Sequence, residues 1–276
     1  MIRVAVLGAL GRMGSGIVRK VLEQQDMELA AAVEAPGKPG AGRDIGELLG
    51  VGRTGVKLST AEELEQVLRS SGAEVLIDFT NPEASLAAAE VAARVGVDLV
   101  IGTTGFTEAQ KESIRRLVEE SRIAAVLSPN MSPGMNVFFL LVRRLAELLP
   151  DYEVEIVELH HRHKRDSPSG TALRIGELIA KARGRSLEEC ARYGRGREIA
   201  EAERERQEIC FHALRAGDAA GEHTVLFAGE GERIELVHRA HSRECFIGGA
   251  VRAARFVASA EKGRVYSTLD VLGIGE

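Results

Sequence analysis

The sequence predicts an α/β fold: a doubly wound parallel sheet interrupted by an inserted α+β domain. Three observations lead to this prediction. Short apolar runs alternate with helical patterns over the first 130 residues. This rhythm is lost near Pro133, where an apolar helix, a strand that ends in histidines and a charged stretch follow one another, and a helical pattern returns at Ile247. We therefore expect residues 1–130 and 242–276 to form one domain and residues 131–241 to form a second.

The chain opens with a strand, a glycine-rich turn, a helix and a second strand. Gly8, Gly11 and Gly14 lie in the turn, and Glu34 ends the second strand, 20 residues beyond Gly14. The apolar runs fit buried strands, and the segment between them has apolar positions at helical spacing. The expected bounds of the strand, helix and strand are residues 2–7, 15–24 and 29–33.

This order indicates a Rossmann-like unit that binds a dinucleotide. Glycines permit a tight turn and close approach of a pyrophosphate, which the helix N-terminus attracts, while the acidic residue accepts from the ribose hydroxyls. The spacing is GxxGxxG rather than the commoner GxGxxG, so a merely structural turn is the alternative. In this context we assign to cofactor binding Gly8, Gly11, Arg12, Met13, Gly14 and Glu34.

Residues 35–55 contain many glycines and two prolines, which predicts a mobile loop. The loop carries Lys38 and Arg43, and a cation here could meet the 2′-phosphate of NADPH. A solvated loop without a ligand is the other interpretation.

Strands and helices continue to alternate as far as residue 127. Thr60 and Thr107 begin capping boxes, and Asn81-Pro82 begins another helix. The expected helices span residues 60–70, 82–95 and 107–121, and the expected strands span residues 75–79, 99–101 and 123–127.

Ligands of such sheets lie beyond the carboxyl ends of the strands. Small polar residues gather there and suit the edge of a nicotinamide site, although loops of this kind also occur without a ligand. The residues that we assign to the cofactor on this basis are Phe79, Gly102, Thr103, Thr104, Ser128, Asn130 and Met131.

The second domain is expected to combine helices with an antiparallel sheet. It begins with an apolar helix, a strand that ends in histidines, and another helix; these span residues 135–149, 152–160 and 172–183. After a charged stretch, three strand-like runs separated by glycine-containing turns indicate a meander over residues 209–214, 222–227 and 233–239. A helix and a strand over residues 247–260 and 265–269 then rejoin the first domain.

The segment from Glu158 to Ala172, with the sequence ELHHRHKRDSPSGTA, lies where this strand gives way to a helix. Ser169 or Thr171 should cap the helix, whose N-terminus offers free N–H groups and partial positive charge. With Lys164 nearby, the segment forms a candidate pocket for a carboxylate or phosphate beside a proton donor. The alternatives are an ordinary cap and a solvated loop. Zinc binding by His161 and His163 is disfavoured, because no further ligand lies nearby at a familiar spacing.

Composition excludes several classes of protein. The net charge of −5 and the absence of a basic block with aromatic residues give no reason to expect nucleic acid. Three cysteines without CxxC spacing, Cys190, Cys210 and Cys245, indicate a reducing compartment. No apolar run approaches the roughly 20 residues that span a bilayer. We expect a cytoplasmic protein that does not bind membranes.

The glycine turn, the segment Gly102-Thr103-Thr104-Gly105-Phe106 and above all the segment 158–172 resemble the 4-hydroxy-tetrahydrodipicolinate reductase family, also called dihydrodipicolinate reductase. The resemblance covers essentially the whole chain. It implies NAD(P)H-dependent reduction to tetrahydrodipicolinate in lysine and diaminopimelate biosynthesis, by a homotetramer assembled through the second domain. Hydride transfer to a cyclic imine would be followed by protonation.

The resemblance also implies roles for individual residues. His160 matches the family's proposed proton donor, and Lys164 matches the residue that assists it. The positions that hold the carboxylates of the substrate match His161, Ser169, Gly170, Thr171 and Arg243. Many members carry arginine after the acidic residue, whereas this chain has Ala35, so we expect both NADH and NADPH to be used. No metal is expected.

Two other functions remain open. Another nicotinamide dehydrogenase of aspartate-family metabolism would explain residues 1–130 but not the histidine segment. A nucleotide-sensing regulator would need a basic DNA-binding module, which the sequence does not show. Oxidation of NAD(P)H on addition of the product of dihydrodipicolinate synthase distinguishes these functions from the reductase.

Overall fold

The computed structural model describes residues 1–196, 203–205 and 207–274. The chain forms two compact units. Unit 1 comprises residues 1–133 together with the C-terminal segment from Glu244, and unit 2 comprises Gly134–Arg243.

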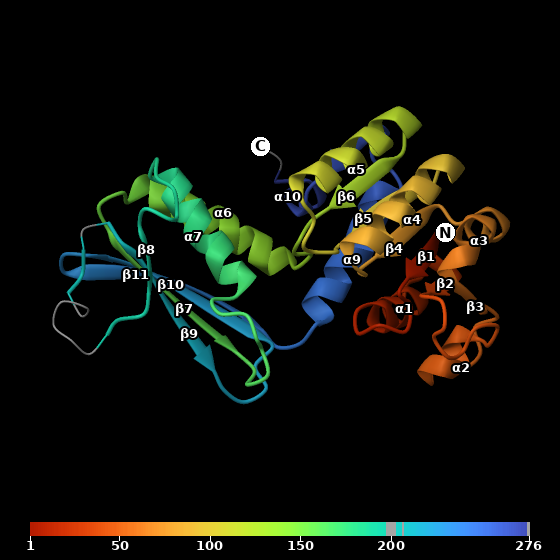
Figure 1. Ribbon diagram of the computed structural model, residues 1–276, viewed down its shortest axis with the longest axis horizontal. Coiled ribbons are helices and arrows are strands. Elements are labelled where there is room, and N and C mark those ends of the chain that lie inside the picture. The colour runs from red at the N-terminus through yellow and green to blue at the C-terminus, as the bar shows by residue number, and fades with distance from the viewer. Residues whose placement is uncertain (197–202, 206, 275–276) are drawn as a thin grey trace. The chain divides into compact units, whose positions relative to one another are not determined.

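Unit 1 is built on a parallel sheet of seven strands, as the sequence predicts (Figure 1). The strand order is β12-β6-β5-β4-β1-β2-β3, so the order reverses between β1 and β4. The strands are β1 (Ile2–Leu7), β2 (Met27–Glu34), β3 (Leu58–Thr60), β4 (Val75–Asp78), β5 (Asp98–Ile101), β6 (Ala124–Leu127) and β12 (Arg264–Tyr266).

Helices cover both faces of this sheet. Val4 and Val6 of β1 contact one helical layer, whereas Ala5 and Leu7 contact the other, which is the alternation of a fully buried strand. The first layer contains α1 (Gly14–Leu22), α9 (Glu244–Val257) and α10 (Thr268–Val271). The second contains α3 (Leu64–Ser71), α4 (Pro82–Val95) and α5 (Glu108–Ser121).

The helix starts follow the expected capping signals. Asn81 accepts a hydrogen bond from the Ala84 N–H at 3.0 Å and caps α4. Thr107 and Gln110 form the capping box of α5. The box at Thr60 opens a 3₁₀ turn, η1 (Ala61–Glu63), which leads into α3.

The segment after Glu34 contains structure that the sequence analysis did not predict. A short helix, α2 (Ile45–Leu49), begins at Asp44, and β3 follows it. The Asp44 carboxylate accepts from the N–H groups of Gly46 at 2.8 Å and Gly55 at 2.7 Å, as well as from Thr54. One buried side chain thus joins the two ends of this segment.

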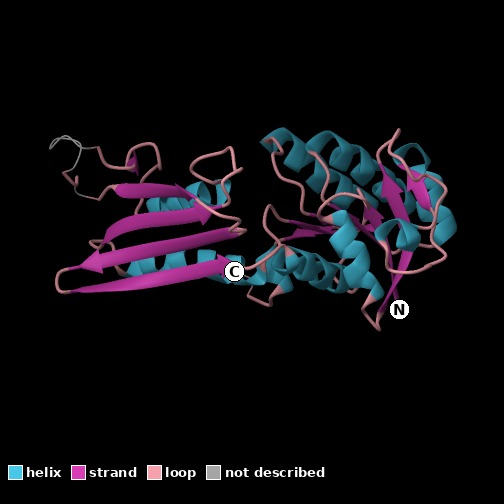
Figure 2. Cartoon of the chain, turned by 90° about the horizontal axis from the view of Figure 1, so that it is seen from below, coloured by secondary structure: helices cyan, strands magenta, loops and turns pink. Residues whose placement is uncertain are grey.

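Unit 2 is a five-stranded mixed sheet covered on one face by two helices, as Figure 2 shows. Its strand order is β11-β10-β7-β9-β8. The strands are β7 (Glu153–His160), β8 (Ala191–Tyr193), β9 (Ile209–Arg215), β10 (Gly221–Gly229) and β11 (Glu232–Ala240). The helices are α6 (Pro133–Leu148), whose first residue belongs to unit 1, and α7 (Gly170–Ala182).

The prediction of an antiparallel meander is wrong in the order of the strands. β10 and β11 form an antiparallel hairpin, but β7 lies between β10 and β9 and pairs with β9 in parallel. Turn signals between consecutive strands reveal hairpins and cannot reveal an earlier strand inserted between them. The insertion places His160 opposite Arg215 in the register of the sheet.

The tail also differs from the expected strand over residues 265–269. β12 ends at Tyr266, and Ser267 then forms a capping box with Asp270 that begins α10. Among the described residues, no helix has the length and apolar character required to cross a membrane.

Candidate active site

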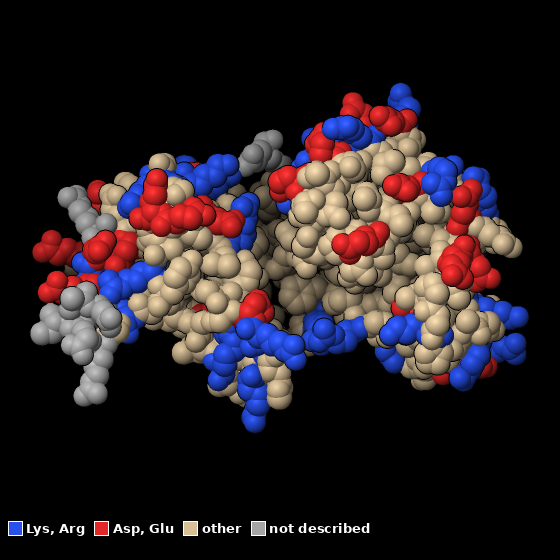
Figure 3. Space-filling view, in the orientation of Figure 1, with Lys and Arg blue, Asp and Glu red and all other residues tan. Residues whose placement is uncertain are grey.

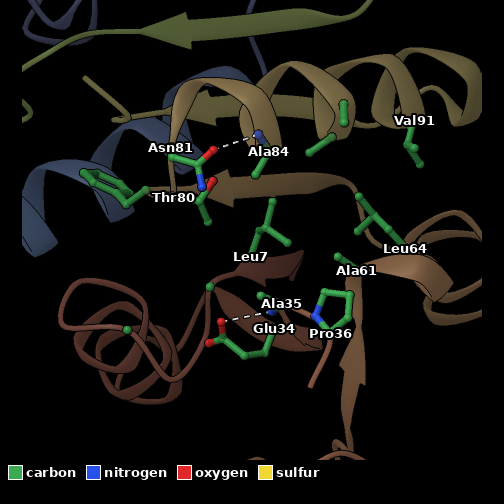
Figure 4. Close-up of a pocket in the computed structure, with 15 residues that line it drawn as sticks. Leu7, Glu34, Ala35, Pro36, Ala61, Leu64, Thr80, Asn81, Ala84 and Val91 are labelled. Atoms are coloured by element: carbon green, nitrogen blue, oxygen red, sulfur yellow. Dashed lines mark hydrogen bonds between the residues drawn. The ribbon is translucent and has the colours of Figure 1, made fainter. Parts of the chain in front are cut away.

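Unit 1 contains a cavity of about 440 Å³ at the carboxyl ends of its central strands (Figure 4). It lies where the strand order reverses between β1 and β4, the position at which open α/β sheets bind ligands. Its lining comprises Leu7, Gly8, Gly11, Glu34, Ala35, Pro36, Ala61, Leu64, Phe79, Thr80, Asn81, Ala84, Ala87, Ala88 and Val91.

The glycine turn packs too closely for side chains. Gly8 has a φ of +70°, which favours glycine. A Cβ on Gly14 would lie 2.0 Å from the carbonyl oxygen of Gly8, and one on Gly11 would lie 3.1 Å from that oxygen. The turn therefore brings bare backbone to the start of α1, as pyrophosphate binding requires.

Glu34 points toward the glycine turn, as Figure 4 shows. Its carboxylate accepts hydrogen bonds from the Leu10 N–H at 2.9 Å and the Ala35 N–H at 3.0 Å. Lys38 and Arg43 are exposed and do not line the cavity. Glu34 thus lines the cavity as expected, and the two candidate cations do not.

Sequence analysis missed the apolar wall of the cavity. One face of α4 contributes Ala84, Ala88 and Val91, and Pro36 and Ala61 lie across from it. The signal that could have found this wall is the run of small residues at helical spacing directly after Asn81-Pro82. Such a wall suits the flat apolar faces of an adenine ring.

A buried polar network lies beyond β4 and β5. Asp78 is 1% exposed and accepts from the Thr80 N–H at 2.8 Å and the Thr80 hydroxyl at 2.7 Å. The Ser85 hydroxyl contacts both Asp78 and the Thr103 hydroxyl, the latter at 2.8 Å. Burial raises the pKa of Asp78, although these hydrogen bonds act to lower it. The network joins the two loops that we expected at the nicotinamide.

The other residues that we expected at the cofactor lie in different environments, some packed within the protein and others exposed. The ring of Phe79 packs on Gly102, where a Cβ would lie 2.1 Å from it, and the Ser128 hydroxyl donates to the Asn130 carbonyl at 2.9 Å. Met131 is 1% exposed and belongs to the hydrophobic core, so its side chain is not available to a ligand. Three further residues of the expected set, Arg12, Met13 and Thr104, are exposed or partly exposed.

The histidine segment lies in unit 2 at the end of β7. Val154, Ile156, Glu158 and His160 face the covering helices, while the residues between them face the open side. His160 is 8% exposed, and its Nδ1 contacts the Glu158 carboxylate. Burial lowers the pKa of His160, and Glu158 offsets part of this effect.

Two residues that sequence analysis did not single out complete this cluster. Arg215 of β9 donates two hydrogen bonds to Glu158, at 2.8 and 2.9 Å. His223 of β10 is 3% exposed, and its ring lies edge-on to His160 with the centroids 5.2 Å apart. Burial lowers the pKa of His223 to about 3, so this ring is neutral at physiological pH.

The start of α7 contains residues of the predicted anion pocket. Ser169 caps the helix by accepting from the Ala172 N–H at 3.1 Å, and its hydroxyl also contacts Nε2 of His223 at 3.2 Å. Lys164 contacts both carboxylate oxygens of Asp166 at 2.9 Å. Hydrogen bonding to Lys164 lowers the pKa of Asp166, to which the Gly170 N–H also contributes. A carboxylate of the protein itself thus pairs with the Lys164 amine.

The remaining substrate residues are less closely joined. Thr171 lies in the first turn of α7 and is partly exposed. His161 follows β7, with its N–H donating to the Ala219 carbonyl at 2.9 Å, and its ring is 6.3 Å from that of His163. Arg243 is exposed in the segment between β11 and α9.

Lys and Arg side chains gather over the tips of β7 and β9, as Figure 3 shows. The cations that the segments at these tips contribute are Arg162, Lys164, Arg165 and Arg215. This end of unit 2 is therefore electropositive, although the whole chain carries a net charge of −5. Such a surface attracts dianionic ligands.

A second cluster on the open face of the sheet contains possible metal ligands. Ligand atoms of Glu155, Cys210 and His212 lie within 4.8 Å of one another. Glu155 is already paired with His212 at 2.6 Å, with Arg195 at 2.8 Å and with Arg204. The two guanidinium groups oppose the binding of a cation here.

Both halves of the chain match one family. Residues 2–131 match the family described as dihydrodipicolinate reductase, N-terminus, and residues 134–272 match dihydrodipicolinate reductase, C-terminus. The chain belongs to the dihydrodipicolinate reductase family. This confirms the resemblance found in the sequence, and it gives the chain the family's role as an oxidoreductase of lysine and diaminopimelate biosynthesis.

Curated relatives agree over the full length. The 4-hydroxy-tetrahydrodipicolinate reductase of Methanothermobacter thermautotrophicus is 54% identical over 274 residues, covering 99% of this chain and 100% of its own. That of Methanocaldococcus jannaschii is 51% identical over 276 residues, covering 100% and 99%.

Solved structures of the family and of other dehydrogenases share the fold. A dipicolinate-bound dihydrodipicolinate reductase from Paenisporosarcina sp. TG-14 superimposes with a TM-score of 0.77 at 26% identity, and covers 98% of each chain. An amine dehydrogenase from Mycobacterium smegmatis has a TM-score of 0.65 at 13% identity, covering 95% of this chain and 94% of its own, and shows the shared fold alone.

Proposed function

We propose that the chain reduces 4-hydroxy-tetrahydrodipicolinate with either NADH or NADPH, that unit 1 binds the dinucleotide, and that the segment 158–172 binds and protonates the substrate. The observation that carries this proposal is the grouping of His160, Lys164 and the α7 N-terminus at one end of unit 2 in a chain of this family.

The residues of unit 1 fit a dinucleotide. Gly8, Gly11 and Gly14 leave room for a pyrophosphate at the start of α1, and the apolar wall on α4 offers a surface for adenine. Glu34 can exchange its backbone partners for ribose hydroxyls. When bound, the nicotinamide supplies the hydride.

Unit 2 offers two cationic features to a dicarboxylate. Lys164 provides a full charge, and the N-terminus of α7 provides N–H groups and partial positive charge. Asp166 now contacts Lys164, so a substrate carboxylate that binds Lys164 would take the place of Asp166. Charge-assisted hydrogen bonds of this kind contribute roughly 1.5 to 3 kcal/mol each.

His160 is suited to supply the proton. Its ring lies at the edge of this pocket, and Glu158 stabilises its protonated form. Because burial lowers the pKa of His160, its protonated fraction is small at neutral pH and rises as the pH falls. The rate of a proton-limited step should rise in the same direction.

We also propose a homotetramer assembled through unit 2. The face of its sheet opposite α6 and α7 carries several apolar side chains, and Leu214 and Val237 on this face are 49% and 43% exposed. Burial of such residues between copies of the chain would favour association.

The direct test is an assay with the product of dihydrodipicolinate synthase. Purified protein should oxidise NADH and NADPH only when that product is present. Failure to oxidise either cofactor would reject the proposal. Oxidation with other imines but not with this one would indicate a different dehydrogenase of aspartate-family metabolism.

A further inference from the structure

The Glu158 carboxylate is surrounded by hydrogen-bond donors from three segments. Its side chain is 1% exposed. Oε1 accepts from Nη2 of Arg215 at 2.8 Å and from the Ser169 N–H at 3.1 Å. Oε2 accepts from Nη1 of Arg215 at 2.9 Å and contacts Nδ1 of His160. These four contacts match the accepting capacity of a carboxylate, so Glu158 is fully satisfied.

We propose that Glu158 and Arg215 are positioning residues of the reductase, which hold the His160 ring with its hydrogen on Nδ1 so that proton transfer to substrate takes place at Nε2. This inference rests on the proposed function of His160 as the proton donor. It assigns roles to two residues that need not touch the substrate themselves.

The tautomer follows from the partner of each ring nitrogen. Arg215 and the other donors keep Glu158 ionised: although burial opposes ionisation, they lower the pKa of Glu158. An ionised carboxylate only accepts, so the His160 nitrogen that faces it must carry a hydrogen. Nε2 then remains for the exchangeable proton. A Cβ on Gly221 would lie 3.0 Å from Nε2, so glycine at this position leaves the space beside Nε2 free of a side chain.

Arg215 extends the same arrangement to the lysine. Its Nη2 donates to the Asp166 carbonyl at 2.7 Å, and Asp166 in turn holds Lys164. One guanidinium therefore connects Glu158 with the loop that carries Lys164. Without Arg215, Glu158 would be a buried carboxylate lacking its full cationic partner, which proteins disfavour.

Four ionisable side chains act on the His160 ring: Glu158 on its own strand, Arg215 on β9, Lys164 in the following loop and neutral His223 on β10. Glu158 favours the protonated ring, whereas Arg215 and Lys164 oppose it. Removal of Glu158 should therefore lower the pKa of His160, and removal of Arg215 should raise it.

The first test measures the tautomer directly. In the wild-type protein with ¹⁵N-labelled histidine, the shifts of His160, assigned with His160→Gln, should show hydrogen on Nδ1. Glu158→Gln should lose this tautomer. The matched control is Glu155→Gln, which removes an ion-paired carboxylate from the opposite face of β7 and should leave the His160 shifts unchanged. A wild-type Nε2–H tautomer would overturn the proposal, even if Glu158→Gln failed to fold.

The second test is the pH dependence of kcat. Glu158→Gln should lower kcat about 10-fold or more. It should also shift to lower pH the limb of the profile on which kcat decreases as the pH rises. Arg215→Met should move this limb to higher pH. If both variants moved this limb in the same direction, or if neither variant moved it, the proposal would be overturned. If His160→Gln retained wild-type kcat, the proposed function of His160 would fail, while the NMR result would still stand on its own.

Discussion

We propose that the chemistry of unit 2 depends on His160. It ends β7 within a cluster that contains one carboxylate and a second histidine. If His160 is the proton donor, the position of its proton and the pKa of its ring matter more for catalysis than the packing of the ring. We propose that Glu158 on the same strand and Arg215 on β9 control both properties.

Replacement of His160 by glutamine should lower kcat by about 10²-fold or more, the usual scale for loss of a general acid. The Kd for NADH should not change, because the glycine turn lies in unit 1. Steady-state assays and NADH titration measure the two quantities. Unchanged kcat would remove His160 from the catalytic role.

Cofactor choice depends on Glu34 and the residue after it. Glu34 suits the free ribose hydroxyls of NADH, while a 2′-phosphate would bring negative charge against it, and Ala35 supplies no cation. We expect use of both cofactors, with NADH at least as good. A charge-assisted contact of about 1.5 to 3 kcal/mol from Lys38 or Arg43 could offset the repulsion.

Lys38→Ala and Arg43→Ala should accordingly weaken NADPH more than NADH. The comparison of KM for both cofactors in each variant measures this effect. A wild-type enzyme that prefers NADPH a hundredfold and is unaffected by either substitution would contradict the assignment of the 2′-phosphate to these cations.

Among the elements, those with local signals were predictable. Asn81 and Thr107 begin helices as expected, and the apolar runs of β1, β4 and β5 are buried strands. Ser267 illustrates the limit, because its capping box ends β12 and opens α10 where alternation suggested a longer strand. The helix α2 was missed because its glycine-rich surroundings carry no helical pattern. Asp44, which caps its N-terminus, is a single residue and was not recognised as a cap.

Asp44 should make the α2 segment sensitive to acid. Although burial opposes ionisation, hydrogen bonds from the N–H groups of Thr54, Gly55 and Glu47 lower the pKa of Asp44 to about 2. A carboxylate with a lowered pKa stabilises the fold above its unfolded pKa of about 3.9, and this stabilisation is lost as the pH falls toward 2.

The difference in urea midpoint between the wild type and Asp44→Asn should therefore be largest near neutral pH and should shrink below about pH 4. Unfolding of both proteins at several pH values provides the measurement. A difference that grows as the pH falls would show that the Asp44 carboxylate is not ionised in the folded protein.

At the scale of the whole molecule, the sequence predicted the two kinds of sheet but not how the second sheet is ordered. The glycine turn and the histidine segment were visible because each is continuous in sequence. Arg215 and His223 were not, because they join His160 only through the pairing of β7 with β9 and β10. Long-range strand order leaves no local pattern, so the partners of His160 on β9 and β10 could be found only from the fold.

We propose that the same sheet carries the assembly interface. If its open face joins copies of the chain, Val237→Glu should reduce the tetramer to smaller species by placing a charge in the apolar contact. Light scattering after size exclusion measures the mass. Leu148→Glu, at a 58% exposed position on α6, is the control and should not change it. A wild-type monomer would contradict the proposed assembly.

We propose that unit 1 binds the dinucleotide and that unit 2 binds the dicarboxylate. A pair of titrations on two variants, one with NADH and one with dipicolinate, tests this division of binding directly. Gly14→Ala places a Cβ 2.0 Å from the Gly8 oxygen, whereas its control Gly248→Ala meets no atom within 4 Å. Thr171→Val keeps the volume at the start of α7 but removes a hydroxyl.

Gly14→Ala should weaken NADH binding roughly 10-fold or more and leave dipicolinate binding unchanged. Thr171→Val should weaken dipicolinate binding by a similar factor, the loss of one hydrogen bond to a charged group, and leave NADH binding unchanged. If either variant weakened both ligands equally, or if each weakened the other unit's ligand, the division of binding between the two units would be wrong.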